Sequence, residues 1–220
     1  MLDKVFGKIK PPSLKVAGDH AASRISLSVL DHRGGYPWLT VKDILPDDVN
    51  QQIKSQNVMR LAGGRMLVDV FDNPHVIRSL YKVFGECDYP IRSDRIRSIY
   101  VQSQTTGPGH SLRPHEDAWP RVFTMIYYFP EDNSYPLAGT AIYEVDESTR
   151  TYKTVATSPY QINTATIMVP CTGHGWHGVD LITRPVNRQS AVIVFDAEPW
   201  DENNQDYHHT PYGRTVDYVR

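Results

Sequence analysis

The sequence predicts a mostly β protein with flanking N-terminal helices and a jelly-roll core. Helical periodicity occurs only before about residue 90, whereas from about residue 95 onward apolar and polar residues alternate with a period of two. Gly, Pro, Asn and Asp divide this second part into about eight short strands. A helical preface followed by about eight short strands is typical of a double-sheet jelly roll.

The N-terminal part of the chain contains signals for one strand and two helices. Residues 37–41 combine aromatic and β-branched side chains, so we expect a short strand there. Pro46 and the acidic residues that follow it suit the first turn of a helix near 47–61. Asn73 can cap a second helix over 74–84, in which apolar residues recur on one face.

Eight later segments have the composition of strands. They alternate between apolar and polar residues, or they are rich in β-branched and aromatic side chains. The candidate strands cover 96–104, 113–117, 121–129, 139–146, 151–157, 164–169, 176–182 and 189–196. The polar segment 146–150 predicts a hairpin turn between two of them.

Length and composition predict a single domain. A chain of 220 residues with 40% hydrophobic residues is large enough for one core. Residues 1–35 are rich in turn formers, and we expect them to form an N-terminal arm or an irregular edge. Residues 36–198 should form one jelly-roll domain together with its helices, and residues 199–220 should form a polar C-terminal tail.

Charge, hydropathy and cysteine content limit the partners of this chain. A net charge of −2 gives no basic surface for non-specific nucleic-acid binding. No run approaches the roughly 18 apolar residues that a membrane span requires. Cys87 and Cys171 do not make a disulfide framework. We therefore expect a soluble cytoplasmic protein that has no nucleic-acid or membrane partner.

The segment His115-Glu116-Asp117 can supply two metal ligands from one strand. Residues i and i+2 of a strand point to the same face, so His115 and Asp117 project together while Glu116 points away. A second imidazole, from another strand across the barrel, would complete a set of two histidines and one carboxylate. This set leaves three positions of an octahedron open and is typical of non-haem Fe(II) oxygenases.

Two histidines compete for the third ligand position. His177 stands at the start of an extended run that leads toward Arg188. His174 lies between two glycines, which is more typical of a loop. His177 is therefore the preferred ligand, and His174 remains the alternative.

A downstream arginine can bind an acidic co-substrate. The planar guanidinium of Arg188 matches a carboxylate with two parallel hydrogen bonds. A dicarboxylate held in this way can fill two of the open metal positions. Arg188 leads directly into the apolar strand 191–195, whereas its rival Arg184 precedes Pro185. Ser190 lies two residues further on the same face and can add a hydroxyl to that contact.

These motifs lie in a stretch, 95–196, that resembles the prolyl-4-hydroxylase-like 2-oxoglutarate/Fe(II)-dependent dioxygenases. Residues 113–117 contain the metal motif, and residues 121–129 look like the strand that follows it in these hydroxylases. Residues 176–192 run from the Trp-His-Gly-Val motif to the strand that begins near the arginine. Residues 36–46 are similar to the first strand and helix of the same group.

The resemblance implies an enzyme that uses Fe(II), 2-oxoglutarate and O2. It would hydroxylate an unidentified small-molecule or peptidyl substrate and release succinate and CO2. His115, Asp117 and His177 would be both the metal ligands and the catalytic residues. The presence of Asp117 favours hydroxylation, because related halogenases have a small residue at that position.

The resemblance also implies which residues bind the 5-carboxylate of 2-oxoglutarate. The usual spacing in the family between the distal histidine and the arginine favours Arg188 over Arg184. Tyr128 matches the position whose phenol reaches the same carboxylate. Gln102 falls where related enzymes place a polar contact to the co-substrate, and Ser190 is a further candidate.

Two other classes of function remain open. One is a jelly-roll metal enzyme of another kind, such as a cupin-like isomerase or a dioxygenase that does not use 2-oxoglutarate. The other is a non-catalytic module that keeps a metal for structure. A structural zinc site closes its metal with four ligands, and the sequence offers three good ones, which argues against this last alternative.

Overall fold

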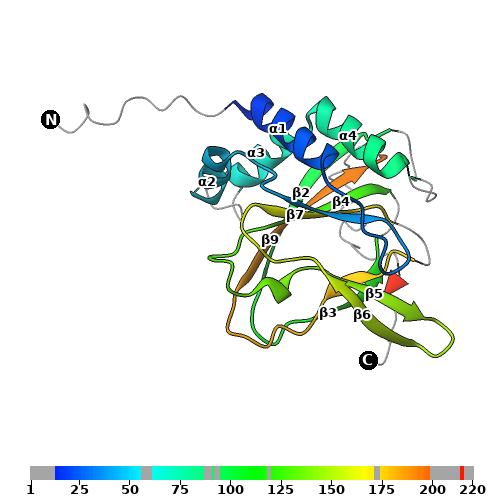
Figure 1. Cartoon of the computed structure of the whole chain (residues 1–220). Helices are drawn as coiled ribbons and strands as arrows, with labels where there is room; N and C mark the ends of the chain where they lie inside the picture. The colour runs from blue at the N-terminus through cyan, green and yellow to red at the C-terminus, as the bar shows by residue number, and fades with distance from the viewer. Residues whose placement is uncertain are drawn as a thin grey trace.

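The computed structural model describes most of the chain, and the expected mostly β architecture with N-terminal helices is confirmed. The described residues are 13–55, 61–86, 91, 95–117, 120–170, 174–198 and 214–215. Figure 1 shows two β-sheets that face one another, with the helices gathered on the outer side of one sheet.

The described part of the chain contains four α-helices, one short 3-10 helix and ten strands. The helices are α1 (Leu14–Ser26), α2 (Asp47–Ser55), α3 (Leu61–Phe71), α4 (Pro74–Gly85) and the 3-10 helix η1 (Pro136–Ala138). The strands are β1 (Trp38–Lys42), β2 (Ser98–Thr106), β3 (Leu112–Glu116), β4 (Arg121–Tyr128), β5 (Ala141–Asp146), β6 (Thr151–Thr157), β7 (Thr164–Met168), β8 (His177–Val179), β9 (Arg188–Asp196) and β10 (Arg214–Thr215).

Two five-stranded antiparallel sheets build the core. The first has the order β1-β7-β4-β9-β2, and the second has the order β10-β3-β8-β5-β6. Every residue of β4 is buried, as is nearly every residue of β9. Helices cover one face of these central strands and the second sheet covers the other, which explains their nearly continuous apolar sequences.

The two faces of strand β4 have different roles: one packs against the helices, and the other lines a pocket between the sheets. Phe123 points to the helices, where its ring lies 5.7 Å from that of Phe84 and 5.2 Å from that of Tyr81. Thr124 and Ile126 point to the space between the sheets and line a pocket there. Successive residues of a strand face opposite sides, so one strand serves both layers.

Helix α4 begins where the sequence predicts it. The side chain of Asn73 accepts a hydrogen bond of 2.8 Å from the backbone N–H of His75, and Pro74 occupies the first turn. Val76, Leu80 and Phe84 are buried, which confirms the apolar face expected for this helix. The cap satisfies a donor that would otherwise lack a partner at the helix start.

The N-terminal region differs from the expectation in two ways. The predicted arm 1–35 is wrong for residues 14–26, because α1 forms there and packs against α3 and α4. Small residues line its buried face, so the apolar stripe that signals a helix is weak. The helix predicted near 47–61 forms over Asp47–Ser55, while residues 56–60 lie outside the described residues. Helix α3 was not predicted.

Several predicted features fall outside the described residues. These include Cys87, Cys171 and most of the tail 199–220. The exception in the tail is β10, which pairs antiparallel with β3 and so lies beside the metal motif. Among the described helices, none is long and apolar enough to cross a membrane.

Candidate metal centre and co-substrate pocket

His115, Asp117 and His177 come together at one end of the space between the sheets. One ligand atom from each lies within 4.8 Å of the other two, and all three residues are buried. Nε2 of His177 lies 3.8 Å from Oδ2 of Asp117, and the two imidazole centroids are 4.3 Å apart. His177 is the Cα partner of His115 in the ladder between β3 and β8. The distal histidine thus lies on the adjacent strand, whereas the sequence analysis expected it across the barrel.

Backbone carbonyls fix the orientation of both imidazoles. Nδ1 of His115 lies 3.0 Å from the carbonyl oxygen of Arg113, and Nδ1 of His177 lies 2.8 Å from that of Gly175. A carbonyl can only accept, so each Nδ1 carries the proton and donates. In the neutral form of each ring Nε2 then offers a lone pair, as in metal-binding histidines held in this way.

The carboxylate of Asp117 is held on both oxygens. Nη1 of Arg121 donates to Oδ1 at 2.6 Å, and the hydroxyl of Thr124 donates to Oδ2. Burial alone would raise the pKa of Asp117, but the charge of Arg121 and the contacts with His177 and His115 lower it to about 2. Asp117 is therefore ionised at neutral pH and ready to bind a cation.

His115 stays neutral for a different reason. Burial lowers the pKa of His115 to about 3, and the nearby His177 acts in the same direction. A neutral imidazole is the form that binds metals. Two imidazoles and one carboxylate suit a divalent transition metal such as Fe(II), so the residues present fit the ion expected from the sequence.

The structure brings His177 and not His174 to this centre. His174 is exposed, and it lines a separate surface depression with Gly34 and Glu144. Trp176, beside His177, packs with Ala141 and Tyr143 away from the triad. That indole therefore belongs to a small core cluster.

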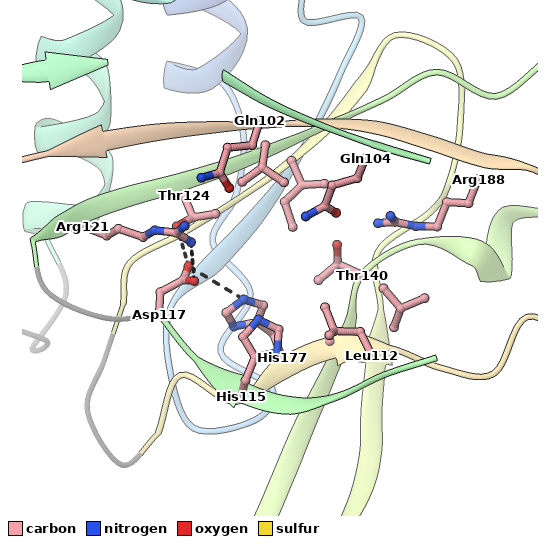
Figure 2. Close-up of a pocket in the computed structure, with 14 residues that line it drawn as sticks. Gln102, Gln104, Leu112, His115, Asp117, Arg121, Thr124, Thr140, His177 and Arg188 are labelled. Carbon is pink, nitrogen blue, oxygen red and sulfur yellow. Dashed lines mark hydrogen bonds and ion pairs between the residues drawn. The ribbon is translucent and has the colours of Figure 1, made fainter. Parts of the chain in front are cut away.

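A pocket extends from the triad toward β9. Figure 2 shows the triad at one end and Arg188 at the other, with the amide of Gln104 between them and that of Gln102 above the triad. The residues that line it are Gln102, Gln104, Leu112, His115, Asp117, Arg121, Thr124, Ile126, Thr140, His177, Gly178, Val179, Arg188 and Val192.

Arg188 is a buried cation at the far end of the pocket. Its Nε donates to the carbonyl of Ala138 at 2.7 Å, and Nη1 donates to the hydroxyl of Ser190 at 3.0 Å. Burial lowers the pKa of Arg188, which favours an anionic partner in this position. Arg184, the rival in the sequence, lies over the ring of Tyr135 at 5.3 Å and lines a different pocket.

The other predicted co-substrate residues are divided between the pocket and the layer behind it. Gln102 lines the pocket, whereas Tyr128 and Ser190 are not among its lining residues. The phenol of Tyr128 lies within 2.7–2.9 Å of the hydroxyls of Thr140, Ser158 and Thr166. Tyr128 thus stands behind Thr140, which itself lines the pocket.

Sequence reasoning missed four polar lining residues: Arg121, Thr124, Gln104 and Thr140. One signal for Gln104 was present, because it lies two residues after Gln102 on the same face of β2. No local sequence pattern identified Arg121, Thr124 or Thr140 as pocket residues. Arg121 and Thr124 belong to a strand that reads as continuous core.

No protein-family model matches the sequence, and no curated protein matches it either. Among solved structures, a prolyl-4-hydroxylase from Pseudomonas putida is similar, with 14% identity, a TM-score of 0.51 and coverage of 90% of this chain and 99% of that one. The non-haem α-ketoglutarate-dependent epimerase SnoN from nogalamycin biosynthesis has 13% identity, a TM-score of 0.50 and coverage of 93% and 91%. HygX from Streptomyces hygroscopicus, solved with nickel and 2-oxoglutarate bound, aligns less well, with 10% identity, a TM-score of 0.48 and coverage of 73% and 82%.

The likenesses to the prolyl-4-hydroxylase and to SnoN confirm the fold that the sequence predicted. Both better-aligned neighbours are 13–14% identical to this chain, so the likeness concerns architecture. The chain has the jelly-roll fold of the prolyl-4-hydroxylase-like 2-oxoglutarate/Fe(II) oxygenases.

Proposed function

We propose that this chain is a 2-oxoglutarate- and Fe(II)-dependent dioxygenase that hydroxylates a small-molecule or peptidyl substrate. One observation carries the proposal: two Nε2 atoms and one carboxylate converge at one end of a pocket whose other end holds a buried arginine. A metal site at one end and a cation at the other suit a ligand with two acidic groups.

His115, His177 and Asp117 would hold the metal. Backbone carbonyls orient both imidazoles and the carboxylate of Asp117 is ionised, so the three side chains suit a divalent cation. Bound Fe(II), together with 2-oxoglutarate and O2, supplies the oxidation chemistry that yields succinate, CO2 and a hydroxylated product. The reducing cytoplasm expected from the sequence would keep the iron ferrous.

Arg188 would bind the distal carboxylate of 2-oxoglutarate. Its guanidinium is oriented by Ala138 and Ser190 and lies in the pocket with Thr140 and Gln104. A hydrogen bond to a charged group contributes about 1.5–3 kcal/mol, which corresponds to roughly 10- to 150-fold in affinity.

The remaining walls would exclude water. Leu112, Ile126, Val179 and Val192 line the pocket between its polar groups. An apolar, closed lining strengthens electrostatic contacts with a bound anion and keeps bulk water from the reacting groups. The tests below distinguish this function from a 2-oxoglutarate-independent enzyme.

Anaerobic titration with Fe(II) and then 2-oxoglutarate tests the proposal. We expect a visible metal-to-ligand charge-transfer band in the native protein and none in Asp117→Ala. Arg188→Met should retain Fe(II) but require at least tenfold more 2-oxoglutarate to reach half of the band. Arg184→Met, which removes a surface arginine outside this pocket, is the matched control.

Two outcomes would contradict the proposal. A native protein that binds Fe(II) but forms no band with 2-oxoglutarate would point to another jelly-roll metal enzyme. Turnover that is independent of 2-oxoglutarate and unchanged in Arg188→Met would do the same. A panel of metabolites and peptides, screened for substrate-stimulated succinate release, then identifies the substrate class.

A further inference from the structure

Arg121 is a buried cation that lies against the carboxylate of Asp117. The exposed fractions of the two side chains are 7% and 1%. Nη1 of Arg121 donates to Oδ1 of Asp117 at 2.6 Å, and Figure 2 shows this contact beside the two imidazoles. Separating a buried ion pair is destabilising, because it leaves an uncompensated charge in the interior. Arg121 and Asp117 therefore restrain each other's position.

The two oxygens of Asp117 have different surroundings. Oδ1 faces Arg121, whereas Oδ2 accepts from Thr124 and lies 3.8 Å from Nε2 of His177. Oδ2 is therefore the oxygen turned toward the imidazoles. Hydrogen bonds to both oxygens fix the rotation of the carboxylate about its last bond.

Arg121 also has a second acidic neighbour. Asp196 of β9 is the Cα partner of Arg121 and is fully buried. Burial lowers the pKa of Arg121, but Asp117, Tyr100 and Asp196 outweigh burial and raise that pKa. The guanidinium therefore stays charged in the interior, as the contact with Asp117 requires.

The number of oxygens through which Asp117 binds the metal would decide whether a coordination position stays open for O2. Three protein ligands leave three of the six octahedral positions open. A bidentate 2-oxoglutarate takes two of them, and O2 needs the third. A carboxylate that bound through both oxygens would take one more position, so 2-oxoglutarate would fill the site and leave no place for O2.

We propose that Arg121 is a positioning residue that keeps Oδ1 of Asp117 away from the metal, so that the carboxylate binds through Oδ2 alone. Thr124 supports the same orientation from the other oxygen. This role rests on the proposed function, because the vacant position matters only for a metal that must bind O2.

Nitric oxide, which occupies the O2 position of Fe(II) and gives an electron paramagnetic resonance signal, provides a test that does not depend on turnover. In native protein loaded with Fe(II) and 2-oxoglutarate, we expect tight nitric oxide binding. Arg121→Gln should retain the 2-oxoglutarate band but bind nitric oxide at least tenfold more weakly. Arg121→Lys keeps the charge and should recover part of the affinity.

Steady-state kinetics provide a second readout. Arg121→Gln should lower the maximal rate of succinate formation at least tenfold while changing the KM for 2-oxoglutarate less than threefold. A purely structural defect would instead lower the fraction of protein that binds Fe(II) and leave the kinetics of the remaining protein unchanged.

Thr124→Val provides a milder variant in case Arg121→Gln does not fold. It keeps the shape of the side chain and removes only the donor to Oδ2, and we expect about threefold weaker nitric oxide binding. Thr154→Val is the matched control, because its hydroxyl donates to the carboxylate of Asp180 outside the pocket. Arg33→Gln likewise removes an arginine–aspartate pair far from β3 and β4, the pair with Asp31.

The outcomes separate this proposal from the proposed function. A native protein without the 2-oxoglutarate band would overturn the function itself. If the native protein shows the band and both Arg121→Gln and Thr124→Val bind nitric oxide as tightly as native, the positioning role is overturned and the function stands.

Discussion

Gly178 lies where the two histidine-bearing strands come closest, and replacing it by alanine should weaken metal binding. A Cβ at this position would lie 2.3 Å from the carbonyl oxygen of Leu112, 2.9 Å from that of Arg113 and 3.1 Å from Cε2 of Tyr143. Carbon–oxygen contacts are normally about 3.3–3.6 Å. Strands β3 and β8 must therefore separate by about 1 Å.

The displaced atoms belong to the proposed metal centre. His177 directly precedes Gly178, and the carbonyl of Arg113 is the one that orients the imidazole of His115. A misplacement of about 1 Å in an active site can reduce the catalytic rate about 100-fold. Overpacking typically lowers the free energy of unfolding by about 1–3 kcal/mol. We expect Fe(II) affinity to fall about 10- to 100-fold and the free energy of unfolding to fall by about 1–3 kcal/mol.

A chelator-competition titration measures the affinity, and urea unfolding measures the stability. Gly64→Ala is the matched control, because a Cβ there meets only Val101 carbons at 3.9 Å. Gly64 lies inside α3, so its replacement should stabilise the fold by about 0.5–1 kcal/mol and leave metal affinity unchanged. Native-like Fe(II) affinity in Gly178→Ala would refute the reasoning.

Two further predictions concern stability against pH and the choice of histidine. Burial raises the pKa of Asp196 to about 6, against an ordinary value near 4, so its contribution to stability is present at low pH and is lost as pH rises through 6. Asp196→Asn removes that loss. The unfolding free energy of the variant minus that of the native protein should therefore increase by roughly 2 kcal/mol between about pH 4 and pH 8. If urea unfolding shows the same pH dependence of stability for both proteins, this prediction is contradicted. His177→Ala should abolish Fe(II) binding measured by calorimetry while His174→Ala leaves it unchanged, and the reverse pattern would move the third ligand to His174.

Local sequence signals located most elements of the fold. The strand predicted over 121–129 forms over Arg121–Tyr128, and the one predicted over 151–157 has the same bounds in the structure. Turn formers and a period of two act within a few residues, so the chain itself encodes them. The helix α1 escaped prediction because its buried face consists mainly of small residues.

The sequence by itself predicted that His115 and Asp117 share a face, because the side chains of i and i+2 do so in an extended segment. In the structure β3 ends at Glu116 and Asp117 follows directly. The sequence also singled out His177 and Arg188, although it left His174 and Arg184 as alternatives. Their burial and their place in one pocket depend on how the strands are paired.

Only the tertiary structure decided what surrounds these residues. The register between β3 and β8 sets His115 opposite His177, and the packing of the two sheets brings Arg121 of β4 against Asp117. Likewise, η1 brings the carbonyl of Ala138 to Arg188 from fifty residues away in the sequence. Such contacts follow from strand register and sheet packing, and no local pattern of residues encodes them.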